Sequence, residues 1–201
     1  MSGITGQNLG KHSGLVKAAS GGGGEWTLIL TQTASSSANI SFTSGLDSTY
    51  DEYCFKFNNI HAATTNADLL ILASIDAGSN YNAAISTTCV ISKADEGDSS
   101  TEVSYEGSHD AHSSTTGAKI TIEQSTSNDA CSSGYLYLYN PAGTTYTKLF
   151  MSDMESAEDA PKTFHCLVSG YANTTSAVNA IQFKFSSGNI DAGTISLYGI
   201  G

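Results

Sequence analysis

Short segments in which apolar and polar side chains alternate place the strongest constraint on how this chain folds. In residues 181–185 isoleucine and phenylalanine occupy every second position, and residues 194–198 alternate in the same way. Successive side chains of a β-strand point to opposite faces, so this period predicts strands that are buried on one side. Because Ser187, Gly188 and Asn189 lie between the two segments and favour a turn, we expect a closing β-hairpin there.

The same reasoning predicts strands along most of the chain after residue 25. Tyr53, Phe55 and Phe57 share one face of the clearest of them, and we expect this face to pack against Ile181, Phe183 and Phe185. Serine, threonine, asparagine and glycine fill the intervals and favour turns over helices. Ten or eleven strands predict an all-β fold: an antiparallel two-sheet sandwich, specifically a jelly roll. The predicted strands lie in residues 26–33, 39–43, 48–57, 67–74, 83–91, 120–122, 135–139, 146–154, 163–171, 180–185 and 193–198.

The first 24 residues differ in composition from the remainder and predict an extended arm before a sandwich domain of residues 25–201. They are small and polar, end in four glycines, and contain Lys11 and Lys17 but no acidic residue. Such a segment buries too little apolar surface to fold alone, and glycines make a flexible hinge. Two interpretations stay open: the arm binds the acidic body of a neighbouring copy, or it is a tail without a role.

Charge argues against several classes of partner. The net charge is −11, and all eight basic residues are lysines, so the chain lacks the basic surface that binds nucleic acid. No apolar run approaches the 18 or so residues that span a bilayer, and the N-terminus does not have the order of a signal peptide. We therefore expect neither nucleic-acid binding nor membrane insertion, and synthesis in a cytoplasm without secretion.

Candidate metal ligands are present but are not spaced as known sites require. Cys54, Cys89, Cys131 and Cys166 form no CxxC pair, so we expect thiols, mostly buried, with disulfides as the alternative. Residues 76–80 and 95–98 offer oxygen ligands but do not follow the twelve-residue calcium loop. Residues 109–112 hold two histidines three apart, which suits a metal on a helix, yet a polar loop is favoured over a metal site. We expect no metal and no cofactor.

No motif predicts catalysis. The chain has no Gly-x-Ser-x-Gly turn, and neighbours such as His165 and Cys166 point to opposite faces of a strand. A pair of glycosidase carboxylates is defined by spatial separation, so sequence selects none of the 19 acidic residues. We therefore expect a protein that is not an enzyme.

A stripe of tyrosines is the most informative candidate surface. Tyr135, Tyr137 and Tyr139 alternate with Leu136 and Leu138. If the leucines face the core, the tyrosines face outward, where a ring with a polar tip suits a subunit interface. A platform for stacking sugars is the alternative. The candidate interface residues are Lys11, Lys17, Trp26, Tyr135, Tyr137 and Tyr139.

Two segments, residues 45–61 and 178–200, resemble small virion structural proteins of tailed bacteriophages, especially those of marine bacteria and cyanobacteria. The first includes Tyr50-Asp-Glu-Tyr-Cys-Phe-Lys-Phe57, the second includes Ile181-Gln-Phe-Lys-Phe185, and Trp26-Thr-Leu-Ile29 is a looser third match. The resemblance covers most of residues 25–201 with a variable middle. It implies a β-sandwich displayed on the virion surface, as a head decoration protein or a tail fibre, with no catalytic residues.

Residues and resemblance together lead to three expectations. The first is a decoration protein that forms a homotrimer or another closed oligomer and contacts other virion proteins, such as major capsid or tail proteins, through its arm and one sandwich face. In a decoration protein of this kind, we expect loops such as residues 93–116 to face solvent. The second is a tail adhesin that binds a host surface glycan. The third, an enzyme acting on polysaccharide, is the least favoured.

Overall fold

The computed structural model describes residues 25–97, 99–157 and 162–201, so the expected arm with Lys11 and Lys17 lies outside the described residues. The described part contains twelve β-strands and one short 3-10 helix, η2 (Gly107–His109), and it has no helix long and apolar enough to cross a membrane. The strands are β1 (Trp26–Thr33), β2 (Ile40–Phe42), β3 (Glu52–Ala62), β4 (Leu69–Ser74), β5 (Ile85–Asp95), β6 (Thr101–Tyr105), β7 (Ala118–Lys119), β8 (Cys131–Tyr139), β9 (Lys148–Ala157), β10 (Lys162–Ala172), β11 (Ala180–Phe185) and β12 (Ile190–Ile200).

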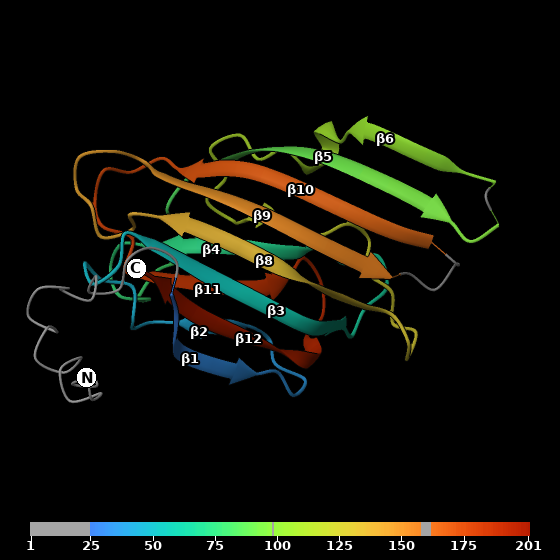
Figure 1. Cartoon of the computed structure of the whole chain (residues 1–201), viewed down its shortest axis with the longest axis horizontal. Coiled ribbons are helices and arrows are strands. Elements are labelled where there is room, and N and C mark those ends of the chain that lie inside the picture. The colour runs from blue at the N-terminus through green and yellow to red at the C-terminus, as the bar shows by residue number, and fades with distance from the viewer. Residues whose placement is uncertain (1–24, 98, 158–161) are drawn as a thin grey trace, which may run out of the picture.

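The strands form two antiparallel sheets packed as a sandwich. The large sheet has the order β1-β12-β3-β8-β9-β10-β5-β6, and the small sheet has the order β2-β11-β4-β7. In Figure 1 the large sheet lies in front of the small one. The antiparallel pairs β1–β12, β2–β11, β3–β8 and β4–β7 nest within one another along the chain. This nesting, divided between two sheets, is the topology of a jelly roll, as the sequence predicts.

Two pairs of strands are added to the jelly roll. Strands β5 and β6 are inserted between β4 and β7, β9 and β10 between β8 and β11, and all four extend the large sheet beyond β8. The chain around Ile120, Ile122 and Gln124 lies behind this extension: both isoleucines are buried, and Gln124 Nε2 donates to Ser156 Oγ of β9 (3.0 Å). The large sheet therefore has a covered inner face along its added strands as well.

The prediction of a closing hairpin is wrong. β11 pairs with β2 and β4 in the small sheet, whereas β12 pairs with β1 and β3 in the large sheet. The chain crosses between the sheets at residues 186–189, where Gly188 has φ +71°. Both strands bury one face against the same core, so they show the same alternation as two strands of a hairpin would.

The core contains the expected aromatic contact between the sheets. Phe183 of β11 is fully buried, and its ring centroid lies 5.1 Å from that of Phe55 and 5.0 Å from that of Phe57. Phe42 of β2 joins them, 5.2 Å from Phe55. The prediction that the 181–185 face packs on the 53–57 face is confirmed for Phe183.

The expectation that residues 93–116 all face solvent is partly wrong. A short strand near Val103 is predicted and present as β6, but β5 continues to Asp95 and His109 is only 5% exposed. The reason is that the chain after β6 returns along β5, where Thr87 N donates to Ala111 O (3.0 Å) and Ile85 N to Ser114 O (2.8 Å). Residues 109–114 therefore belong to the body of the fold.

Candidate functional site

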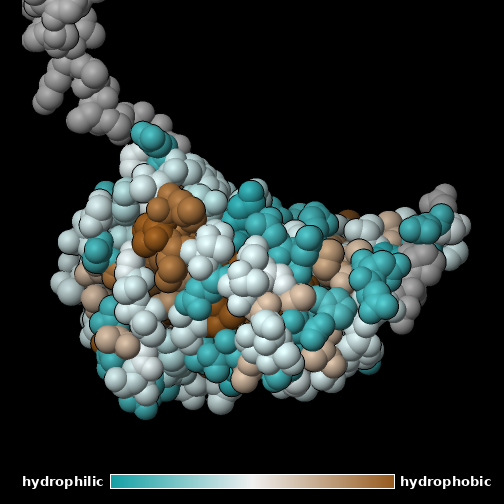
Figure 2. Space-filling model, turned by 90° about the horizontal axis from the view of Figure 1, so that it is seen from below, coloured by the Kyte–Doolittle hydropathy of each residue, from teal (hydrophilic) through white to brown (hydrophobic). Residues whose placement is uncertain are grey.

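The outer face of the large sheet, which points away from the small sheet, holds most of the exposed apolar side chains. Register places ten of the twelve large hydrophobic residues that are exposed in the described chain at outward-facing positions of this sheet, the exceptions being Ile75 and Tyr146. In Figure 2, seen from below, hydrophobic atoms gather on the side of β1, close to where the described chain begins. The ten are Trp26, Leu28, Val90, Val103, Tyr105, Tyr139, Leu149, Met151, Leu167 and Tyr171.

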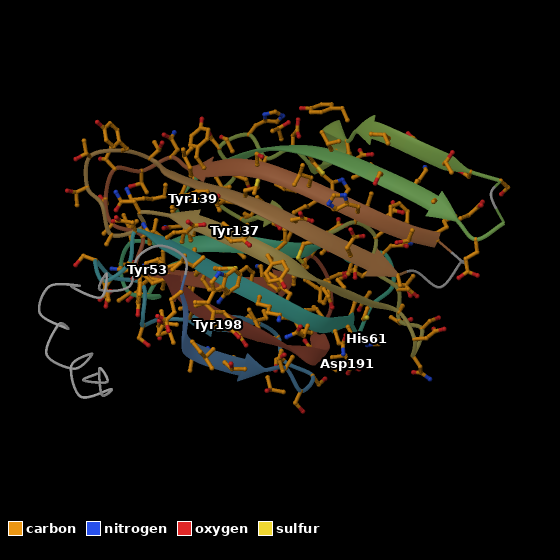
Figure 3. The ribbon with its side chains drawn as sticks, in the orientation of Figure 1. Tyr53, His61, Tyr137, Tyr139, Asp191 and Tyr198 are labelled. Carbon is orange, nitrogen blue, oxygen red and sulfur yellow. The ribbon has the colours of Figure 1, made fainter. Side chains whose placement is uncertain are left out.

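Strand register brings aromatic residues from distant parts of the chain into one group on this face. Tyr198 of β12 and Tyr137 of β8 are both Cα partners of Cys54 in β3, so the three form a row across the sheet. Figure 3 shows Tyr137, Tyr139 and Tyr198 on the front of the large sheet. The tyrosines of β8 point outward because Leu136 and Leu138, 0% and 2% exposed, fill the core.

Trp26 is the centre of this group, which we call the aromatic cluster (Trp26, Tyr135, Tyr137 and Tyr198). Its ring centroid lies 5.9 Å from Tyr135 and 6.2 Å from Tyr137, both edge to face, and 5.4 Å from Tyr198. Tyr135 and Tyr137 stack at 6.3 Å, and Lys56 Nζ lies 5.9 Å from the Tyr135 ring centroid. These are favourable aromatic and cation–π geometries, so the rings hold one another in place.

The cluster buries Cys54, although this residue lies on the outer face. Cys54 is 0% exposed between Tyr198 and Tyr137. Burial, with a smaller effect of the Glu52 charge, raises the pKa of its thiol to about 12. The thiol therefore stays protonated at neutral pH and is a packing residue, not a nucleophile.

Tyr139 belongs to a second part of the outer face. It lines a shallow depression of about 530 Å³ together with Leu149, Met151 and Tyr171. Met151 is the Cα partner of Tyr137, so this depression is continuous with the aromatic cluster. Burial and the Glu52 charge raise the pKa of Tyr139, which keeps its phenol neutral.

The other loops singled out in the sequence use their polar groups to hold turns and packing. Asp76 accepts from Asn80 Nδ2 (2.7 Å) and from Ser74 Oγ (2.7 Å), while Asp95 accepts from Ser99 Oγ and from Ser99 N (2.7 Å). These hydrogen bonds lower the pKa of both carboxyls, that of Asp76 to about 2. Asp98 is outside the described residues.

The cysteines and the 109–112 histidines are placed in different surroundings. All four cysteines are free thiols; Cys54, Cys89 and Cys166 are buried, as predicted, and Cys131 is half-buried. Cys89 and Cys166 approach to 3.5 Å between their Sγ atoms on neighbouring strands. His109 is buried at the end of η2, whereas residues 110–112 lie outside helices and strands and His112 is exposed. The predicted polar loop is therefore present at residues 110–112, with His109 buried beside it.

A polar cluster near η2, in which His109 and Asp68 are buried and Ser108 is exposed, superficially resembles a hydrolytic triad. Ser108 Oγ lies 3.1 Å from His109 Nδ1, and His109 Nε2 lies 3.4 Å from Asp68 Oδ1 without a well-aligned hydrogen bond. However, Ser108 Oγ donates to Glu106 Oε1 (2.6 Å), and Asp68 Oδ1 also accepts from Glu123 N (2.8 Å). The serine is therefore held by a carboxylate, and Asp68 joins separate segments of the fold.

Sequence reasoning found part of this surface and missed the rest. It singled out Trp26, Tyr135, Tyr137 and Tyr139, and the structure brings the first three together while Tyr139 lines the adjoining depression. It missed Tyr198, although the alternation in residues 194–198 could have placed that ring opposite buried Leu197. Comparisons of the chain with family models, curated proteins and solved structures give no match.

Proposed function

We propose that this chain is a non-enzymatic structural protein of a bacteriophage virion, a surface decoration protein that binds neighbouring subunits through the outer face of its large sheet. The observation that supports this most is the concentration of exposed apolar and aromatic side chains on that one face. Monomeric proteins rarely leave such a contiguous area in water, and aromatic residues and methionine are enriched in interfaces.

The partner in this proposal is a second copy of the same chain. All 19 acidic residues and only six of the eight lysines lie in residues 25–201, whereas residues 1–24 carry Lys11 and Lys17 and no acidic residue. The first 24 residues of one copy are thus complementary in charge to the body of another. They join the body at Glu25, next to Trp26 in the aromatic cluster, which favours a closed homo-oligomer such as a trimer.

The geometry of the cluster favours a protein partner over a sugar. Trp26 meets Tyr135 and Tyr137 at interplanar angles of 88° and 89°. Rings packed edge to face cover one another, whereas sugars stack on ring faces that are free. The cluster is therefore better suited to burial in a protein interface.

One feature favours a second candidate function, a tail adhesin that recognises a host surface glycan. Tyr139 and Tyr171, 38% and 37% exposed, both line the 530 Å³ depression on β9 and β10. These rings are outside the aromatic cluster, and a shallow hollow with tyrosines suits a sugar ring. In this alternative the same face would bind a glycan and not a subunit.

Copy number on the particle distinguishes the proposed roles. We expect quantitative mass spectrometry of purified phage particles encoding this chain to find hundreds of copies per particle, scaled to the major capsid protein. A few to a few dozen copies would favour the tail adhesin. Purified particles without the chain would overturn both virion roles.

A further inference from the structure

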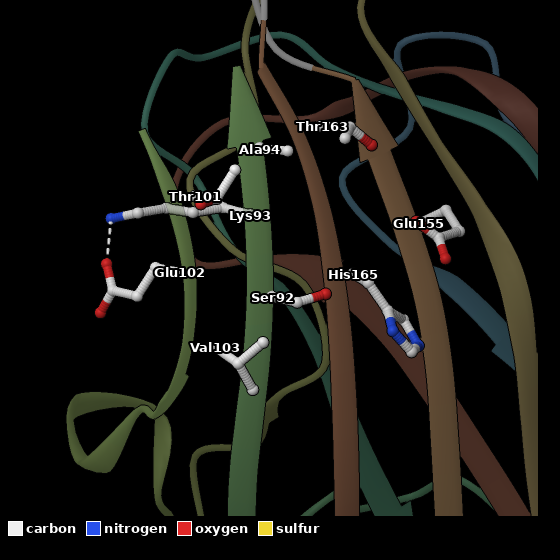
Figure 4. A pocket seen from close by; sticks show the side chains of 9 residues that line it. All are labelled: Ser92, Lys93, Ala94, Thr101, Glu102, Val103, Glu155, Thr163 and His165. Carbon is white, nitrogen blue, oxygen red and sulfur yellow. Dashed lines mark ion pairs between the residues drawn. The ribbon is translucent and has the colours of Figure 1, made fainter. Parts of the chain in front are cut away.

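Two acidic side chains and a histidine meet on the outer face of strands β9 and β10. Asp153 and Glu155 are two residues apart in β9, so both project from the same face. His165 of β10 is the Cα partner of Glu155, which places its ring beside both carboxylates. Figure 4 shows Glu155 and His165 on neighbouring strands, where they line a shallow depression of about 480 Å³.

The side-chain atoms of these three residues are close enough to share one ion. One potential ligand atom of each lies within 4.8 Å of the other two, and this is the only such group of histidine, cysteine and acidic residues in the described part of the chain. His165 Nε2 lies 2.8 Å from Asp153 Oδ1. Both side chains keep much of their surface in water, with exposures of 38% and 49%, so an ion can enter without unfolding the sheet.

Lys93, the one lysine of the described chain that lines the same depression, does not compete for these carboxylates. Lys93 Nζ is paired with Glu102 Oε2 at 2.7 Å, on the far side of β5. On the other side, the Cα partner of Asp153 is Tyr135 of β8, which has no cationic group. The two carboxylates therefore outnumber the one imidazole beside them, and Lys56, one strand beyond Tyr135, has its Nζ 5.9 Å from the Tyr135 ring centroid.

We propose that Asp153, Glu155 and His165 bind one divalent transition-metal ion, with Zn²⁺ as the best match. An imidazole nitrogen and two carboxylate oxygens are ligands that zinc accepts, whereas calcium and magnesium prefer oxygen alone. Three protein ligands leave a fourth coordination position that a water molecule can fill. The ion would replace the direct contact between His165 and Asp153 and would cross-link β9 to β10.

Calorimetric titration of the untagged full-length protein, stripped of metal with a chelator, tests this site. We expect ZnCl₂ to bind at one ion per chain, with CaCl₂ and MgCl₂ binding far more weakly. His165→Ala and the near-isosteric Asp153→Asn should each weaken Zn²⁺ binding by about tenfold or more, since even the loss of a residue that only supports a ligand costs that much.

Two histidine variants serve as controls. His112→Ala removes an exposed histidine outside the site, and His61→Ala removes one that is paired with Asp191 at 3.4 Å. Both should bind Zn²⁺ as the unaltered protein does, and circular dichroism should show all four variants folded. Absence of Zn²⁺ binding, equal binding of Ca²⁺, or unchanged affinity in both His165→Ala and Asp153→Asn would overturn the proposal.

Discussion

Replacing Phe183 by alanine is expected to lower the free energy of unfolding by about 3–5 kcal/mol. Phe183 is fully buried between the sheets, and its ring contacts those of Phe55, Phe57 and Phe42 at centroid distances of 5.1, 5.0 and 6.3 Å. Alanine would remove the ring and leave a cavity that strands held in two sheets cannot fill. Urea denaturation followed by circular dichroism measures the change.

A matched control separates this effect from the loss of any aromatic ring. Tyr146 is 78% exposed in the connection between β8 and β9, so Tyr146→Ala should change stability by less than about 0.5 kcal/mol. A loss below about 1 kcal/mol for Phe183→Ala would mean that the two sheets do not pack through this ring.

The second large effect is expected at Asp68, where Asp68→Asn should lower the free energy of unfolding by about 3 kcal/mol. Asp68 precedes β4 and is 6% exposed; its Oδ2 pairs with Lys119 Nζ of β7 at 2.9 Å, and its Oδ1 lies 3.4 Å from His109 Nε2. An asparagine keeps the shape but removes the charge that pairs with the ammonium group of Lys119, whose side chain is 35% exposed, and one of the two carboxylate oxygens, the one beside buried His109. Asp191→Asn is the control, because its pair with His61 is half exposed and should contribute less than about 1 kcal/mol.

The effect at Asp68 should depend on pH in one direction. Burial alone would raise the pKa of Asp68, but the contacts with His109, Lys119 and Glu123 N–H outweigh it and hold the pKa below the ordinary 3.8. A carboxyl whose pKa is lowered by folding stabilises the fold above its unfolded pKa and loses this contribution as pH falls through the folded value. The difference in free energy of unfolding between the unaltered protein and Asp68→Asn should therefore be at its maximum at pH 7 and decrease below about pH 3.8. A difference that grows on acidification would contradict this account.

Local sequence patterns located most of the strands but not their assignment to sheets. The strand predicted at residues 120–122 is wrong, since β7 covers only Ala118–Lys119. The alternation around Phe55 and Phe183 revealed which side chains enter the core, because a buried face requires it whatever the pairing. The same alternation in β11 and β12 suggested a hairpin, since a short turn gives no sign of whether the chain pairs back on itself or crosses to the opposite sheet. Only the contacts of β11 with β4, and of β12 with β3, distinguish the two.

The candidate sites also combine features that a local pattern predicts with features that only the whole fold determines. A local pattern predicts that the tyrosines of β8 point outward, because Leu136 and Leu138 alternate with them and are buried in the core. The meeting of Trp26 with Tyr198 depends on register between strands that are distant in sequence, and that of Asp153 with His165 depends on register between the consecutive strands β9 and β10. Register is set by the whole fold, so no single segment could predict these contacts.

Sedimentation velocity of the full-length chain tests most directly whether the outer face of the large sheet is the interface. The unaltered protein should sediment as a closed oligomer, and Leu149→Glu should sediment as a monomer at the same concentration, because it places a charge at a 56% exposed position of that face. Ile75→Glu, which alters a 44% exposed residue outside the face, should leave the oligomer intact. A monomeric unaltered protein, or an oligomer that survives Leu149→Glu, would contradict the account.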